Sequence, residues 1–321
     1  MGALIRLALL LMVLLAAGLL GVRVGSTPIP FRDFFSEEWA VIVREVRLPR
    51  VILAILVGGG LAAAGAAYQG LFRNPLADPF LIGTSSGASL GAIVVRLAGL
   101  TGTWLGMGAV PGGAFLGSLL ASVLVFVTGT AGRTWQLARL LLAGAAVGTM
   151  LNALSWILLM RQGEDIAYII GSLLGSLNNR GWTDIAAVWP WLAIGLTGLM
   201  LCARTLDALA LGEDAARGLG LPVRRAVAVV MMCAGLLTAA SVSAGGVIGF
   251  LGLVAPYLAR PFVGHRHVVL IPASALIGAS LLILSDMIAR LAVAPSELPV
   301  GVVTALLAGP FFLAVLAKGR P

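Results

Sequence analysis

The sequence predicts an all-α integral membrane protein, with about ten transmembrane helices in a single domain spanning residues 1–321. Three observations support this fold class. Hydrophobic residues make up 60% of the chain and charged residues only 11%, mean hydropathy is +1.06, and apolar runs recur at the length of a bilayer span. An ordinary soluble domain carries about 25% charged residues, so the composition excludes that class.

A transmembrane span requires about 20 helical residues to cross a hydrocarbon core of about 30 Å, and ten apolar runs of the chain have about this length. The ten runs lie at residues 3–22, 48–70, 80–100, 106–131, 138–160, 185–203, 226–243, 245–260, 270–289 and 298–317. The seventh and eighth are separated only by SAGGVIG, which we interpret as a reversal. The second contains GGGLAAAGAA, residues 58–67, which predicts close helix packing because small residues let backbones approach.

Basic residues in the connections predict the orientation, since Lys and Arg concentrate on the cytoplasmic side. If both termini are cytoplasmic, the inner segments hold twelve of the 21 basic residues and only four acidic ones. The outer segments then hold nine of each sign. The net charge of +8 follows from topology, so membrane lipid is an expected neighbour and nucleic acid is not.

The predicted spans lack the groups that ion-driven transport requires, because such carriers need ionisable side chains near mid-membrane. The stretches without Asp, Glu, Lys or Arg are 51–72, 97–132, 140–160, 185–203, 226–259, 268–285 and 298–317. The single lysine, Lys318, is followed by glycine, which excludes a G-x-x-x-x-G-K-[ST] phosphate loop. If ATP drives the protein, a separate subunit must bind it.

Candidate catalytic and metal-binding residues are few. His265 and His267 of GHRH have no Cys, Asp or Glu nearby in the sequence, so we expect a solvated basic loop and no metal site. Asp286 and Glu297 flank the last outer turn, where we expect salt pairing or helix capping at the membrane surface. No span combines a nucleophile with a base, and the chain is not predicted to be an enzyme.

A charged stretch, LGEDAARGLGLPVRR, lies in the inner segment 204–225 between the sixth and seventh spans. Glu213 and Asp214 stand where a short helix would begin, and Arg217 stands in its last turn. A helix of about seven residues is not stable alone in water. We therefore expect it to pack against another protein or, alternatively, against its own membrane domain.

Two further features lie at the ends of the second span. Arg44, Arg47 and Arg50 cluster at its outer end against the positive-inside trend, so they either snorkel to the headgroups or bind another protein. At the inner end, the prolines of RNPLADP cannot continue a helix. The chain must turn there, and Asn74 and Asp78 are candidates to cap helix ends.

Four motifs, in this order, resemble the FecCD-type permease family of ATP-binding-cassette (ABC) importers for cobalamin, haem and ferric siderophores. They are RLPR at 47–50, RNPLADPFLIGTSSGA at 73–88, LGEDAARGLGL at 211–221 and LSDMIARLAVAPSELPVGVVTALLAGPFF at 284–312. The resemblance implies a type II ABC importer permease fold that works as a homodimer. It also implies two cytoplasmic ATPase subunits, which bind ATP and Mg, and a soluble periplasmic substrate-binding protein.

The same resemblance implies three sets of functional residues. The segment 204–225 would contain the coupling helix that fits the ATPase, and its contact positions would be Leu211, Gly212, Glu213, Asp214, Ala215, Arg217, Leu219 and Gly220. Its apolar side would consist of Leu211, Ala215 and Leu219. The arginines that pair with acidic residues of the docked binding protein would be Arg47, Arg50 and Arg290. The cytoplasmic gate would consist of Asn74, Leu76, Leu137 and Ala138.

The resemblance thus implies a permease subunit in the bacterial inner membrane, with both termini in the cytoplasm. It would move an iron chelate (a ferric siderophore or haem) or cobalamin from periplasm to cytoplasm along the dimer axis. The pathway would be mostly apolar and uncharged, with no cofactor bound by the chain itself. An ATP-independent channel or facilitator for a small solute is the alternative, and co-purification of an ATPase would distinguish the two.

Overall fold

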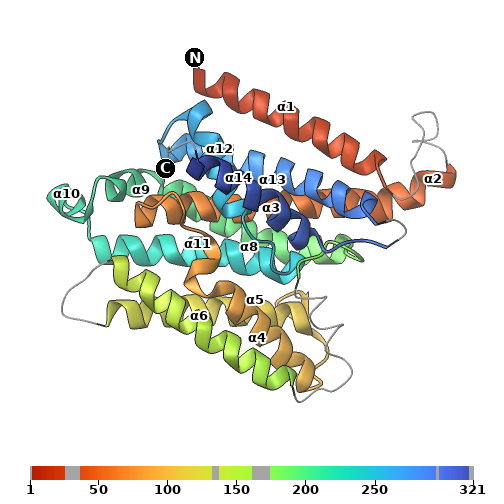
Figure 1. The fold of residues 1–321 in the computed structure, drawn as a ribbon, viewed down its shortest axis with the longest axis horizontal. Coiled ribbons are helices and arrows are strands. Elements are labelled where there is room, and N and C mark those ends of the chain that lie inside the picture. The colour runs from red at the N-terminus through yellow and green to blue at the C-terminus, as the bar shows by residue number, and fades with distance from the viewer. Residues whose placement is uncertain (1, 26–36, 132–136, 161–173, 294–295, 318–321) are drawn as a thin grey trace.

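The computed structural model describes residues 2–25, 37–131, 137–160, 174–293 and 296–317. Long helices lie side by side along one axis of the molecule (Figure 1), which confirms the predicted all-α class. The ten predicted runs are occupied by α1 (Gly2–Arg23), α3 (Leu48–Phe72), α4 (Thr84–Leu97), α5 (Ala109–Thr130), α6 (Leu137–Leu159), α8 (Trp182–Leu201), α11 (Val223–Gly245), α12 (Leu251–Val263), α13 (His267–Leu291) and α14 (Val300–Ala317).

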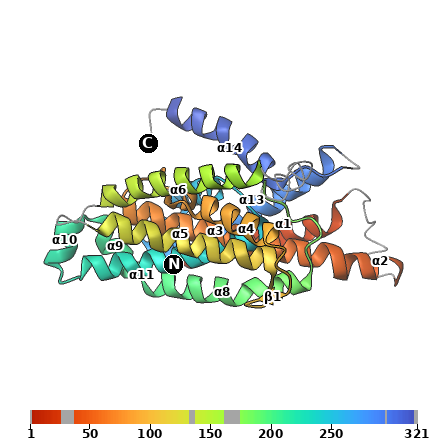
Figure 2. The same ribbon diagram turned by 90° about the horizontal axis from the view of Figure 1, so that it is seen from below.

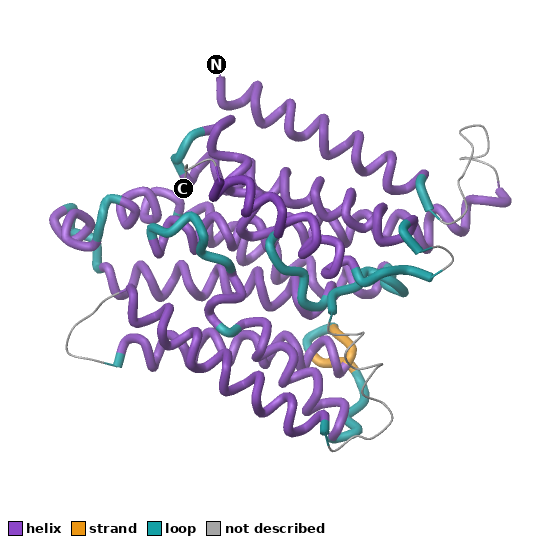
Figure 3. The backbone as a smooth tube through the Cα atoms, in the orientation of Figure 1, coloured by secondary structure: helices purple, strands orange, loops and turns teal. Residues whose placement is uncertain are grey.

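Short elements join the long helices, and the connections gather at the two ends of the bundle (Figure 3). These elements are α2 (Glu37–Val41), the π-helix η1 (Ile42–Arg47), the 3-10 helix η2 (Pro79–Ile82), α9 (Ala203–Ala210), α10 (Glu213–Gly218) and the antiparallel strands β1 (Thr103–Trp104) and β2 (Met107–Gly108). The strand pair was not predicted, because two residues per strand leave no alternation of polar and apolar positions to detect.

Not every predicted span is a full-length helix. Seven described helices are long and apolar enough to cross a membrane, whereas α4 and α12 have 14 and 13 residues, about 20 Å at 1.5 Å per residue. The predicted run 80–100 was too long, since its first residues form η2 between the cap Asp78 and Gly83 at φ 72°. SAGGVIG does separate α11, which ends at Gly245, from α12, which begins at Leu251.

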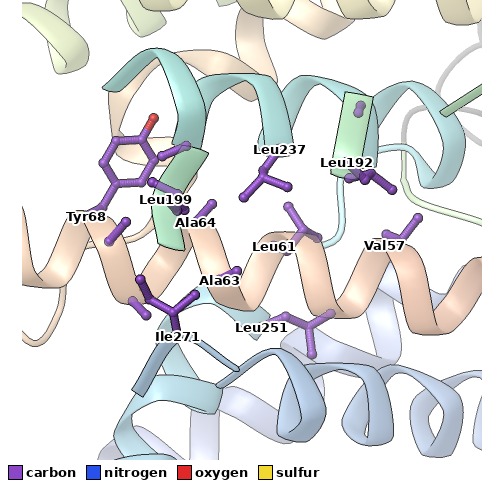
Figure 4. Packing of buried hydrophobic residues seen from close by; sticks show 14 of the residues in the cluster. Val57, Leu61, Ala63, Ala64, Tyr68, Leu192, Leu199, Leu237, Leu251 and Ile271 are labelled. Atoms are coloured by element: carbon purple, nitrogen blue, oxygen red, sulfur yellow. The ribbon is translucent and has the colours of Figure 1, made fainter. Parts of the chain in front are cut away.

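Helix α3 is the centre of the hydrophobic core. Leu192 of α8 and Leu237 of α11 pack on one side of it, and Leu251 of α12 and Ile271 of α13 pack on the other (Figure 4). Leu61, in the middle of α3, is 1% exposed. A helix that is apolar all round in this way is one surrounded by other helices.

Small residues bring the neighbouring backbones against α3. A Cβ atom added at Gly58 would lie 2.5 Å from the carbonyl oxygen of Gly278 in α13, and one added at Gly65 would overlap the carbonyl of Gly252 in α12. The close packing predicted from GGGLAAAGAA is therefore confirmed. Such contacts matter in lipid, where association depends on van der Waals packing and not on burying apolar surface from water.

Large apolar side chains cover much of the outer surface. Leu4 of α1, Leu142 of α6 and Leu201 of α8 are each at least 75% exposed. A protein in water rarely exposes so much apolar surface, whereas lipid chains contact it without penalty. The chain is a multi-pass membrane protein.

The two ends of the bundle differ in what they carry. One end carries α9 and α10, and both chain termini lie toward it (Figures 1 and 2). The opposite end carries α2.

The packing of α3 generates a stability prediction. We expect Gly65→Ala to lower the thermal unfolding temperature of the detergent-solubilised protein markedly, because its methyl group would overlap the backbone of α12 and overpacking costs about 1 to 3 kcal/mol. Gly18→Ala in α1 is the control, since its new Cβ would meet only Val51 at an ordinary 3.8 Å. Equal unfolding temperatures for the two variants would contradict this account of the core.

Candidate functional site

The charged segment 204–225 forms α9 and α10, which project from one end of the bundle (Figure 1). Gly212 precedes α10 at φ 116°, a conformation that favours glycine. Arg217 donates to Glu213 Oε2 (3.3 Å) and to Asp214 Oδ1 (3.1 Å). The predicted short helix is confirmed at its predicted start, with six residues.

The two faces of α10 have different surroundings. Ala216 is fully buried against the protein, as is Leu209 of α9, so the segment is anchored on its own membrane domain. The predicted apolar side points the other way, since Leu211 and Leu219 are 70% and 66% exposed and Ala215 is exposed. The segment therefore packs against its own membrane domain, but this contact leaves three apolar residues exposed.

The predicted gate residues lie on two separate elements. Asn74 Oδ1 accepts from the N–H of Leu76 (2.9 Å), so Asn74 holds the turn itself, and Leu76 is exposed. Leu137 is buried at the start of α6, next to the exposed Ala138, and its N–H donates to Glu213 Oε1 (3.3 Å). No hydrogen bond between these described residues joins the first pair to the second.

Helix α6 meets this connection instead at η2. Gly144 and Gly148 of α6 pack against the backbone of Leu81 and Gly83. Asp78 accepts from the N–H of Phe80 (2.8 Å), so its predicted capping role is confirmed. Burial raises the pKa of Asp78 to about 6, while that hydrogen bond lowers it, and at neutral pH the capping group is mainly an anion.

At the opposite end, the predicted docking arginines form an internal cluster. Arg50 donates to Asp286 (2.8 Å) and Glu297 (2.9 Å), and Arg290 Nε lies 3.1 Å from Asp286 Oδ2. Arg47 donates to the carbonyl oxygens of residues 22 and 23, and Arg290 to those of residues 21 and 24. Two of the arginines thus bind the free carbonyls at the C-terminal end of α1, where cations are favoured.

The placement of these arginines on an accessible outer surface was wrong. Arg47, Arg50 and Arg290 are 6%, 7% and 4% exposed. A guanidinium group can be buried only where it has partners, and here α1 and α13 supply them. Asp286, expected at the membrane surface, is 2% exposed, although its predicted salt pairing is confirmed. Of the clustered arginines, Arg44 is the exposed one.

His267 also departs from its prediction. It is 4% exposed, while His265 lies in solvent as expected. The backbone N–H of His267 donates to Asp207 Oδ1 (2.8 Å), and the ring Nδ1 of His267 lies 2.6 Å from the same oxygen. The ring fits because Gly70 of α3 has no side chain there. The sequence did not indicate the pairing of His267 with Asp207, because 60 residues separate them. Across the described residues, no group of three or more His, Cys, Asp or Glu could hold a metal ion.

A hollow of about 670 Å³, lined mainly by apolar residues, opens between α4, α6 and α14. Its polar lining consists of neutral side chains, which are Ser85, Ser86, Ser89, Asn152 and Ser155. The hollow was not predicted, although serines spaced three to four residues apart in TSSGAS would share one helix face. Its walls could hold a large solute by many weak contacts, without fixed charge.

The model of the FecCD transport family matches residues 10–318. The chain belongs to the FecCD transport family. Residues of this chain are 41% identical to the cobalamin import system permease protein BtuC of Halobacterium salinarum over 287 positions, covering 89% of the chain and 76% of that relative.

Other FecCD-type similarities extend along almost the whole chain. The hemin transport system permease protein HmuU of Yersinia pestis is 39% identical over 324 residues, with 97% of this chain and 94% of that one covered. A metal-chelate type ABC transporter, solved in an inward-facing conformation, superposes with a TM-score of 0.88 at 28% identity, covering 97% and 98% of the two chains. These findings confirm the family resemblance and the ABC permease fold inferred from the four motifs.

The buried ion cluster of this FecCD family member gives a testable consequence. We expect Arg50→Leu to destabilise the protein by about 3 to 5 kcal/mol, since it leaves Asp286 and Glu297 with one fewer buried cation. Arg44→Leu, on an exposed residue of η1, should have little effect. Thermal unfolding in detergent measures both, and an unchanged unfolding temperature for Arg50→Leu would show that the cluster does not stabilise the fold.

Proposed function

We propose that this chain is the membrane-spanning permease subunit of an ABC importer in a bacterial inner membrane, and that the complex imports cobalamin, haem or another iron chelate such as a ferric siderophore. The observation that carries the proposal is the FecCD family match along residues 10–318. Relatives named for cobalamin and hemin transport support the substrate class. Hydrolysis of ATP belongs to a separate subunit, because the single lysine of the chain excludes a phosphate loop of its own.

Two cytoplasmic ATPase subunits, carrying ATP and Mg, would bind at the α10 end of a permease dimer. Support comes from Leu211, Ala215 and Leu219, which are exposed apolar residues within and on either side of the short α10. Gly212, Asp214, Arg217 and Gly220 complete the contact segment implied by the family. The α10 end is then cytoplasmic, as are both termini, and this agrees with the excess of basic residues in the inner connections.

The permease would act as a homodimer with the hollow between α4, α6 and α14 on its axis. Exposed apolar residues flank the hollow, including Trp156 of α6 and Leu306 of α14. A twofold axis beside these helices would bring two hollows together. The resulting pathway would have neutral hydroxyl and amide groups and no fixed charge. Such a lining suits bulky chelates, which are held weakly at many points and then released.

The cytoplasmic end of that pathway would be closed by the two connections that contain Asn74, Leu76, Leu137 and Ala138. Exposed Leu76 and Ala138 are the members of this set with side chains free to meet the other subunit. Buried Leu137 and the turn-forming Asn74 would hold them in position.

A soluble periplasmic binding protein would dock at the α2 end. Exposed Arg44 supplies a positive charge there that can pair with acidic residues on the partner. Arg47, Arg50 and Arg290 support the same surface from within, since they fix the ends of α1, α3 and α13 relative to one another.

The substrate proposal is tested by reconstitution. Vesicles would contain the permease, the ATPase encoded beside it and the cognate binding protein, loaded in turn with cobalamin, haem or a ferric siderophore. Uptake of one of these chelates that requires ATP hydrolysis supports the proposal. Uptake that proceeds equally without the ATPase would favour the alternative, an ATP-independent channel or facilitator.

The contact with the ATPase is tested on α10. We expect Leu219→Asp and Ala215→Asp each to lower ATP-driven uptake at least tenfold, because a charge placed in the apolar contact is costly to desolvate. The control is Leu105→Asp, on a residue that is 50% exposed at the opposite end. Normal uptake by the α10 variants with the ATPase still bound would exclude α10 as the contact.

The dimer axis is tested by cross-linking in native membranes. In a background of Cys202→Ser and Cys233→Ala, we expect Leu306→Cys on α14 to form a disulfide between two copies. Ile194→Cys on α8 should not, because α8 and α14 lie on opposite sides of the bundle (Figure 2). The product is measured by its mobility on a non-reducing gel. Dimers from Ile194→Cys alone would place the axis on the other face.

A further inference from the structure

Glu213 differs from the rest of the exposed surface of α10, because its side chain is only 16% exposed. Its two carboxylate oxygens have different partners. Oε2 accepts from Arg217 within the same helix (3.3 Å), and Oε1 accepts from the backbone N–H of Leu137 (3.3 Å). Since Leu137 is the first residue of α6, this carboxylate joins the segment 204–225 to the N-terminal end of another helix, 76 residues away in sequence.

The electrostatics of this contact are favourable. The first N–H groups of a helix have no partner within it, and a carboxylate at that end interacts with the positive end of the helix dipole. Leu137 itself is 6% exposed and packs into the main core. Displacement of the Leu137 backbone would therefore displace the packed first turn of α6.

Helix α6 extends from that contact to the hollow between α4, α6 and α14. It has 23 residues, about 33 Å at 1.5 Å per residue, and its residues Asn152, Ser155 and Trp156 line the hollow. It also packs closely against η2 through Gly144. A shift at its first turn would thus reach the pathway walls as a movement of one rigid helix.

The neighbouring helix α9 is held elsewhere. Asp207 of α9 accepts from the N–H of His267, at the first residue of α13, and lies beside its ring. Helices α9 and α10 are therefore tied to two different long helices, α13 through Asp207 and α6 through Glu213. Asp214, next to Glu213, provides the internal comparison, because its side chain is fully exposed and its ion pair is with Arg217 alone among the described residues.

We propose that Glu213 is a positioning residue that links the ATPase-contact segment to the first turn of α6, so that displacement of α10 is transmitted to the wall of the pathway. The inference rests on the proposed function, since it assumes that an ATPase moves α10. It assigns the Glu213 carboxylate to the interior of the permease, while the apolar residues of α10 contact the partner.

The contact is tested first in the permease alone. Spin labels on Arg139→Cys of α6 and Leu219→Cys of α10, in the background without native cysteines, report the distance between the two helices. We expect Glu213→Ala to broaden the distance distribution, because the link to Leu137 is lost. Asp214→Ala removes a carboxylate of similar size from the same turn and should leave it unchanged. Equal distributions for the two variants would overturn the structural part of the proposal.

The transmission is tested in the complete complex with its ATPase and binding protein. We expect Glu213→Ala to retain the ATPase and hydrolyse ATP while uptake falls severalfold. Glu213→Gln should restore most of the uptake, since its amide oxygen can still accept from Leu137. Wild-type-like uptake by Glu213→Ala would overturn the inference, whereas a wild-type complex without ATP-driven uptake would overturn the proposed function itself.

Discussion

Close backbone contact around α3 is the constraint on which the rest of the structure depends. In lipid, helices associate mainly through van der Waals packing, so the bundle is stabilised where glycines let the backbones of two helices come into contact. Gly58 and Gly65 let α13 and α12 approach within a distance that no side chain would permit. The positions of the surrounding helices, and of the sites at their ends, follow from that contact.

In the part of the chain that the structure describes, two groups of charged residues lie at opposite ends of this apolar bundle and have different roles. At the α2 end, Arg50 and Arg290 share the buried Asp286, and Arg47 and Arg290 bind the last carbonyls of α1. Helix ends meet there, and their free carbonyls require donors. The buried cations therefore fix the geometry of the surface on which a binding protein would dock.

At the α10 end, the charged side chains connect separate elements of the fold. Glu213 binds the start of α6 and Asp207 binds the start of α13, while Leu211 and Leu219 remain exposed for a partner. Between the two ends, α6 lines a hollow whose polar groups are neutral. Under the proposed function, a chelate would move along such a wall without meeting a charge that would hold it, and the energy for transport would enter from outside the membrane.

The sequence by itself determined the fold class, the approximate locations of ten apolar helices and the family, because hydropathy over about 20 residues and four long motifs are local properties of the chain. It also located the short helix at Glu213 and the cap at Asp78. Only the tertiary structure decided that Arg47, Arg50, Arg290 and His267 are buried. Their partners lie on other helices, and the space for them exists only once α1, α3, α9 and α13 have packed, so the surroundings of a charge cannot be read from its neighbours in sequence.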